Sequence, residues 1–333
     1  MHFSQAAHLL KRQLSDANAP LWAQIFITRR CNLNCSFCAV PRCPSNEMRP
    51  DEWLRALEIL SSLGVRVMNV VGGEPTLYDG LWNVLHYASR CNIATILHSN
   101  MINVNNSFVS SLSRAGVFAL EASIDSLDNT HPKSNRHVLD VLNDARALGI
   151  IPIVSTVITK SNIDQIGEIA QRVTEANIMY LVSVYQTVGG CFSTRDMSMV
   201  PDCQDLERLF LSMQQLKKTT SLIKNSSSFL SAPSIHNGNK WHCNGARTLW
   251  ITIDSNGLLM PCQEYRSDMT IFELESQNNL DTWVRNKYDI TRACDGCSYH
   301  CYYEAEALNG IAFAREVPSY LRGLIKLNKH SFQ

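Results

Sequence analysis

Three cysteines stand close together near the start of the chain, where the sequence reads RRCNLNCSFCAV. Cys31, Cys35 and Cys38 have the spacing C-x3-C-x2-C, and an aromatic residue, Phe37, comes directly before the last of them. Thiolates are soft ligands that favour iron–sulfur clusters or zinc. Four thiolates saturate a cubane cluster, so three leave one iron open, as catalytic metal sites require. The spacing therefore predicts a reactive iron–sulfur site, with a zinc site that shares a distant fourth ligand, or unpaired thiols, as the alternatives.

The elements that must position this triplet alternate between strand and helix patterns from about residue 20 to 215. Near-continuous apolar runs predict six strands, at residues 23–28, 67–72, 93–99, 118–125, 151–159 and 178–185. Amphipathic stretches between them indicate helices, so the fold class is α/β with a parallel sheet covered by helices. Right-handed crossovers curl such a sheet into a barrel or partial barrel. Ligands bind at the carboxyl ends of the strands, which is where the triplet lies.

A second motif, GGEPT at residues 72–76, follows the second predicted strand. The cysteine motif and GGEPT, in this order and on these elements, resemble the two signatures of the radical S-adenosylmethionine (SAM) superfamily. The resemblance covers about residues 20–215. It implies a partial (β/α)6 TIM-like barrel, here followed by a smaller C-terminal iron–sulfur domain.

The resemblance also implies a role for each residue at the strand ends. Cys31, Cys35 and Cys38 are expected to bind three irons of a [4Fe–4S] cluster, whose fourth iron takes the amino and carboxylate groups of SAM. Glycine lets the backbone approach a ligand closely, which is the expected reason for the glycine pair in GGEPT. The residues expected to contact SAM are Phe37, Gly72, Gly73, Glu74, Ser99, Asn100, Ser123, Asp125 and Thr156. For the last three, ordinary polarity at a strand end is an equally good interpretation.

A second group of cysteines lies near the other end of the chain. Cys243 and Cys262 span a predicted hairpin, with Gly257 before Cys262, which resembles the signature of SPASM and twitch domains that hold auxiliary clusters in this superfamily. The remaining cysteines are too few for a second auxiliary cluster, which favours a shortened, twitch-like domain with one auxiliary [4Fe–4S] cluster. The four ligands expected for this cluster are Cys243, Cys262, Cys294 and Cys297, because a hairpin pair and a C-x2-C pair can close on one cube.

Cys301, in CDGCSYHC, is the spare cysteine of this group. It could replace one of the four ligands, donate a hydrogen atom as a catalytic residue, or simply be buried. A structural zinc site is the alternative for the whole group. The expected domains are a radical SAM core at 1–218, a linker at 219–240 that is rich in Ser and Asn, and the auxiliary cluster domain at 241–333.

These cofactors define the expected reaction. Reductive cleavage of SAM gives a 5′-deoxyadenosyl radical, which abstracts a hydrogen atom from a small-molecule or peptide substrate. An auxiliary cluster that takes up one electron makes the net reaction an oxidation, such as a dehydrogenation, a decarboxylation or a crosslink. The alternatives are epimerisation, adenosyl transfer, or a non-catalytic iron–sulfur or zinc-binding protein. Only about 22 residues precede the first predicted strand. This leaves no room for a separate leader-peptide domain and favours a small metabolite, or a peptide presented by another protein.

Composition restricts the partners and the location. Lys plus Arg equals Asp plus Glu, 30 against 30, so no charge excess favours nucleic acid or a membrane surface. No apolar run is long enough to span a membrane, and the start of the chain does not read as a secretory signal. Grouped thiols then indicate a reducing cytoplasm, where a flavodoxin or ferredoxin would donate electrons. The cysteines outside the two groups are expected to be small buried hydrophobes; they are Cys43, Cys91, Cys191 and Cys203.

Overall fold

A computed structural model of the chain describes most of the residues between Pro20 and Ala307. The gaps in this range are residue 44 and residues 129–130, 135, 232–242, 244–249, 293, 295–296 and 298. Beyond Ala307 it describes Glu316, Pro318, Arg322, Gly323 and Leu327. Most of the predicted linker, residues 232–240, therefore lies outside the described residues.

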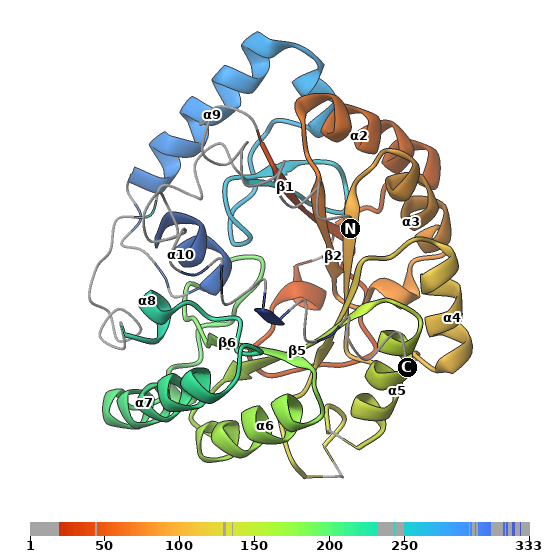
Figure 1. Cartoon of the computed structure of the whole chain (residues 1–333). Coiled ribbons are helices and arrows are strands. Elements are labelled where there is room, and N and C mark those ends of the chain that lie inside the picture. Colours follow the sequence, from red (N-terminus) through yellow and green to blue (C-terminus); the bar gives the residue numbers. More distant parts are fainter. Residues whose placement is uncertain are drawn as a thin grey trace.

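Six parallel strands form the centre of the molecule (Figure 1). They are β1 (Trp22–Thr28), β2 (Val67–Gly72), β3 (Ala94–Ser99), β4 (Ala119–Ser123), β5 (Ile151–Ile158) and β6 (Met179–Val184). Each strand pairs with the next in chain order, so the sheet runs β1 to β6 without a crossover between distant strands. This confirms the predicted partial barrel, and the predicted strand ends are close to the observed ones.

Helices cover the outer face of this sheet in a continuous arc (Figure 1). The arc consists of α2 (Pro50–Leu63), α3 (Leu81–Arg90), α4 (Asn106–Arg114), α5 (Arg136–Ala147), α6 (Ile163–Glu175) and α7 (Cys203–Thr219). Helix α2 shows why such segments are helical. Pro50 occupies its first turn, Glu52 completes a capping box with Arg49, and Gly64 ends it in the left-handed conformation. Its buried face, which includes Trp53 and Leu57, packs into the core shared with the sheet.

The C-terminal part of the chain adds to the β1 edge of the sheet. The predicted hairpin is present as β7 (Trp250–Ile253) and β8 (Leu259–Met260), which pair antiparallel. Strand β7 also pairs in parallel with β1, and the rings of Trp22 and Trp250 stack with centroids 5.7 Å apart. The sheet therefore has eight strands, and the strand that leads to Cys262 is part of it. The proposed domain boundaries stay a prediction.

Three further helices lie on the side where the arc is open (Figure 1). They are α8 (Ser227–Leu230), α9 (Gln277–Arg292) and α10 (His300–Ala307). Short 3-10 turns complete the fold: η1 (Val40–Arg42), η2 (Pro75–Leu77), η3 (Met197–Met199) and η6 (Ile271–Glu275). None of the described helices combines the length and apolarity needed to cross a lipid bilayer.

Candidate active site

A cavity of about 640 Å³ lies against the inner face of the barrel. Its walls include residues from all six strands and from α10. The loop after β1 contributes Cys31, Cys35 and Cys38, and α10 contributes Cys301. One cavity is therefore bordered by both cysteine groups.

The three cysteines of the first group are half-buried on one loop. The loop turns tightly, because the amide of Cys38 donates to the carbonyl of Cys35 at 3.1 Å. Burial raises the pKa of the Cys38 thiol to about 11 and also raises the pKa of Cys31. A thiolate at such a position needs positive charge beside it, and the irons of a cluster supply that charge.

No three Cys, His, Asp or Glu side chains among the described residues lie close enough to hold a single metal ion. A cubane takes one thiolate on each iron, so its ligands need not converge on one atom. The three cysteines share a loop and border one cavity. This arrangement fits a cluster that is held by the loop and whose open iron faces a ligand in the cavity.

The glycines of GGEPT are required by the protein backbone. A Cβ atom on Gly72 would lie 2.3 Å from the carbonyl oxygen of Thr28, and one on Gly73 would lie 2.2 Å from that of Arg30. The amides of Gly73 and Glu74 donate to these same carbonyls, each at 2.8 Å. The glycines thus let the end of β2 press against the start of the cysteine loop. Both also border the cavity, and their expected contact with a ligand stays a prediction.

Glu74 connects GGEPT to the end of β3. Its carboxylate is almost fully buried and accepts hydrogen bonds from the Ser99 hydroxyl at 3.0 Å and from the Asn100 amide at 2.8 Å. The Asn100 side chain in turn donates to Asn32 of the cysteine loop at 2.7 Å. Three strand ends are thus fixed relative to one another. All five expected cofactor residues of this region border the cavity: Gly72, Gly73, Glu74, Ser99 and Asn100.

The residues expected after β4 and β5 fall into two classes. Ser123 and Thr156 border the cavity, although the Thr156 hydroxyl donates to the carbonyl of Ile124 at 2.5 Å. Asp125 is not part of the cavity wall: its carboxylate lies 2.9 Å from the ammonium of Lys133 and accepts from the amide of Val157.

Lys133 is a functional candidate that the sequence did not reveal. It borders the cavity, and its ammonium lies 5.1 Å from the centre of the Phe37 ring, which also borders it. Burial lowers the pKa of Lys133, but the Asp125 carboxylate and the thiols of Cys35 and Cys38 outweigh this and raise it overall. A permanent cation therefore stands beside the cysteine loop. No strand end or motif marks Lys133 in the sequence.

Several cysteines of the second group lie close together in the structure. The pKa values of Cys262 and Cys301 are raised to about 12, chiefly by burial and in part by the neighbouring thiol of Cys243. The pKa of Cys297 is raised by burial and in part by the charges of Cys243, Cys262 and Cys301. These four thiols are therefore neighbours. The pKa of Tyr265 is raised by burial and also by Cys262 and Cys294. The described residues thus place the spare Cys301 beside Cys243, Cys262 and Cys297, and the choice between Cys294 and Cys301 as a ligand stays a prediction.

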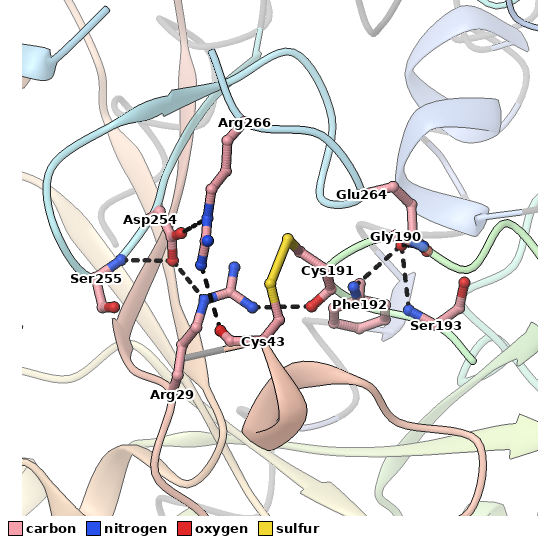
Figure 2. Close-up of a disulfide and its surroundings, with 10 residues drawn as sticks. All are labelled: Arg29, Cys43, Gly190, Cys191, Phe192, Ser193, Asp254, Ser255, Glu264 and Arg266. Atoms are coloured by element: carbon pink, nitrogen blue, oxygen red, sulfur yellow. Dashed lines mark hydrogen bonds and ion pairs between the residues drawn. A yellow bond between two sulfur atoms is a disulfide. The ribbon is translucent and has the colours of Figure 1, made fainter. Parts of the chain in front are cut away.

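The loop after β6 folds over the cysteine loop (Figure 2). The Ala39 amide donates to the carbonyl of Phe192 at 2.9 Å. Phe192 packs against one buried cluster that Cys38 also packs against, and against a second that Cys262, Cys297 and Cys301 also pack against. One oxygen of Glu264 accepts from the amides of Gly190, Phe192 and Ser193 at 3.0–3.2 Å. This carboxylate therefore holds the loop in place.

A disulfide joins Cys43 to Cys191 beside this loop, with Cα atoms 5.4 Å apart (Figure 2). The expectation that both are isolated buried thiols is wrong, because tertiary packing brings together residues that are 148 apart in sequence. It is also wrong for Cys203, which is exposed on α7. Cys91 is half-buried and packs against the core.

A buried ion network supports the same region (Figure 2). Asp254, fully enclosed, binds Arg29 at 2.7 Å and also pairs with Arg266. Both arginines then donate to loop carbonyls, Arg29 to Cys191 at 2.8 Å and Arg266 to Cys43 at 3.3 Å. The network therefore anchors both ends of the disulfide to the β7–β8 hairpin.

Sequence comparison finds one matching family model. The model described as "Radical SAM superfamily" matches residues 25–173. The sporulation killing factor maturation protein SkfB of Bacillus subtilis is 27% identical over 172 residues, which are 48% of this chain and 41% of that protein. PqqA peptide cyclase of Bradyrhizobium diazoefficiens is 27% identical over 193 residues, or 52% of this chain and 51% of that protein. The chain thus matches about half the length of these curated relatives.

Solved structures share the fold. Streptococcus suis SuiB bound to the precursor peptide SuiA has a TM-score of 0.65 at 22% identity, covering 87% of this chain and 70% of that chain. The native anSMEcpe structure with bound AdoMet and Cp18Cys peptide has a TM-score of 0.57 at 16% identity, covering 94% and 99% of the two chains. At these identities the likeness concerns the fold alone.

Proposed function

The chain belongs to the radical SAM superfamily through its domain at residues 25–173, and we propose that it modifies a peptide by hydrogen-atom abstraction. The observation that carries this proposal is the single cavity bordered by the cysteine loop, by GGEPT and by Cys301. The choice of a peptide over a small metabolite is supported by the names of its relatives, a peptide cyclase and a protein that matures a killing factor. A structural neighbour was also solved with a precursor peptide.

The residues around the cavity fit the two cofactors that the family implies. Cys31, Cys35 and Cys38 would hold a [4Fe–4S] cluster, and the strand ends fixed by Glu74 would hold SAM beside it. Lys133 would supply a cation beside the cysteine loop. When bound, the reduced cluster and SAM supply a 5′-deoxyadenosyl radical that abstracts a hydrogen atom from the substrate. The apolar strands keep water away from this step.

We propose net oxidation as the outcome, with a second [4Fe–4S] cluster as electron acceptor. Its ligands would be Cys243, Cys262, Cys297 and Cys301, the four neighbouring thiols, in place of the set with Cys294. Cys301 borders the cavity, so this cluster would lie beside the substrate. Were Cys301 instead a free thiol, it could return a hydrogen atom, which would give epimerisation; adenosyl transfer is a further outcome. A flavodoxin or ferredoxin as electron donor and a cytoplasmic location remain predictions.

The test is release of 5′-deoxyadenosine from SAM by anaerobically reconstituted protein with dithionite, measured by liquid chromatography and mass spectrometry. We expect release by the wild-type protein and none by Cys35→Ala, which removes a ligand of the first cluster. Cys203→Ala, which changes an exposed thiol on α7, is the control and should behave as wild type. Undiminished release by Cys35→Ala would refute the assignment of the first cysteine group. An iron–sulfur carrier or a zinc protein would release no nucleoside in any variant.

A further inference from the structure

The cavity contains a group of ionisable side chains that neither cofactor accounts for. His98 and Glu121 come from neighbouring strands, Lys224 from the segment before α8, and His300 and Glu304 from α10. Glu121, Lys224 and His300 influence one another electrostatically, and Lys224 is also influenced by Glu304. Burying a charged group costs free energy unless the group is paired. We therefore expect this group of side chains to have a function.

His98 and Glu121 form a dyad within this group. They are register partners on β3 and β4 and both border the cavity. The Nδ1 atom of His98 lies 3.1 Å from Oε1 of Glu121. Burial would raise the pKa of Glu121, but His98, Lys224 and His300 outweigh it and bring the pKa to about 2. Glu121 is therefore a carboxylate at neutral pH and accepts the Nδ1 proton.

The other ring nitrogen of His98 is left available. Its Nε2 atom is buried and has no hydrogen-bond partner among the described residues. When Nδ1 of an imidazole carries the proton and donates it to a carboxylate, Nε2 carries the lone pair. Because His98 borders the cavity, a small turn of its ring would let this nitrogen accept a proton from a bound molecule.

We propose that His98, oriented by Glu121, is a catalytic base that accepts a proton from an O–H, N–H or S–H group of the peptide in the cavity. In this step the N–H bond forms at Nε2, the X–H bond breaks, and the electron pair stays on X. The proposal rests on the proposed function, because a substrate that is oxidised after hydrogen-atom abstraction loses its second hydrogen as a proton. Glu121 is the positioning residue.

The test is acylation by diethyl pyrocarbonate, a small reagent that attacks the lone pair of a neutral imidazole. The reconstituted protein is treated at about pH 8, above the ordinary pKa of histidine, and digested with trypsin. Cleavage after Arg66, Arg90 and Arg114 gives two peptides with one histidine each: 67–90 with His86 and 91–114 with His98. His86 is exposed on α3 and serves as the internal reference.

We expect His98 to be acylated at a measurable rate, slower than that of the exposed His86 because its Nε2 atom is buried. In Glu121→Gln the amide no longer fixes the Nδ1 proton, so the rate at His98 should fall about tenfold or more while the rate at His86 stays the same. An unreactive His98 in the wild-type protein, next to a reactive His86, overturns the proposal even if the variant does not fold. An unchanged rate in a folded Glu121→Gln protein overturns the positioning role. Neither result depends on release of 5′-deoxyadenosine. A failure of the proposed function would appear in the nucleoside assay and not in this one.

Discussion

At the scale of single residues, burial decides how the charges of the site behave. Asp254 and Arg29 are almost completely enclosed, and burial lowers the pKa of Arg29 while the Asp254 carboxylate opposes this. Glu304 lies at the cavity, and burial raises its pKa to about 7 although Ser226 donates to it. The same physical cause therefore produces a permanent ion pair at one position and a titrating acid at the other.

We predict that Asp254→Asn lowers the free energy of unfolding by about 3–5 kcal/mol, because it leaves the buried charge of Arg29 uncompensated. Anaerobic urea unfolding followed by circular dichroism measures the change. Asp51→Asn is the matched control, because Asp51 pairs with Arg49 at the exposed start of α2. It should leave the urea midpoint where it is. A midpoint for Asp254→Asn equal to that of the wild type would show that the pair does not support the fold.

Glu304 should make stability depend on pH. Its pKa is raised from 4.5 to about 7 in the folded protein, so the folded state binds a proton that the unfolded state has lost between these values. Stability from this group is complete below about pH 4.5 and is lost as the pH rises through about 7, by at most about 3–4 kcal/mol. Unfolding midpoints measured from about pH 5 to about pH 8 should fall more steeply for the wild type than for Glu304→Gln. Parallel pH profiles for the two proteins would contradict this assignment.

At the scale of elements, one loop joins the parts of the site. Residues 189–193 pack over the cysteine loop, are bonded to it through Cys43 and Cys191, and are held by Glu264 from the segment after β8. Tyr299, which precedes α10, donates to the other oxygen of the same carboxylate. Glu264 is therefore the point at which the barrel loop, the hairpin and α10 meet.

We predict that Glu264→Gln loosens this loop selectively. A neutral amide oxygen is a weaker acceptor than a carboxylate for the three backbone amides. Hydrogen–deuterium exchange at Gly190, Phe192 and Ser193 should therefore speed up by about tenfold, which corresponds to ~1.4 kcal/mol of local stability. Glu273→Gln changes a capping carboxylate of η6 and should leave these amides unaffected. Equal exchange rates at these amides in Glu264→Gln and in the wild type would show that Glu264 does not hold the loop.

At the scale of the whole molecule, the sheet brings the two ends of the chain to one cavity. Strand β7 pairs with β1 and leads to Cys262, while α10 carries Cys301 to the cavity wall. The aromatic side chains of Trp250, Tyr299 and Tyr302 pack against Cys262, Cys297 and Cys301, and Phe192 packs against this cluster and against the one that Cys38 joins. Both proposed clusters therefore lie within reach of one substrate.

Iron content tests this arrangement. We expect about eight irons per chain after anaerobic reconstitution, and about four when either cluster is lost. Cys301→Ala should give about four irons and Cys294→Ala about eight, because only the first residue belongs to the group of neighbouring thiols. The reverse result would restore the ligand set predicted from the sequence, and four irons with one zinc in the wild type would refute the second cluster.

The sequence by itself determined the six parallel strands, the helices between them and the family, because these depend on short patterns: apolar runs of one strand length, C-x3-C-x2-C and GGEPT. It also identified the β7–β8 hairpin. It did not reveal the parallel pairing of β7 with β1, the Cys43–Cys191 bond, Lys133, or the His98–Glu121 dyad. It also did not reveal that the glycines of GGEPT accommodate the backbone of Thr28 and Arg30. Each of these depends on which distant segments pack together, and that is decided by the burial of the whole chain, because no local spacing records a contact between residues far apart in sequence.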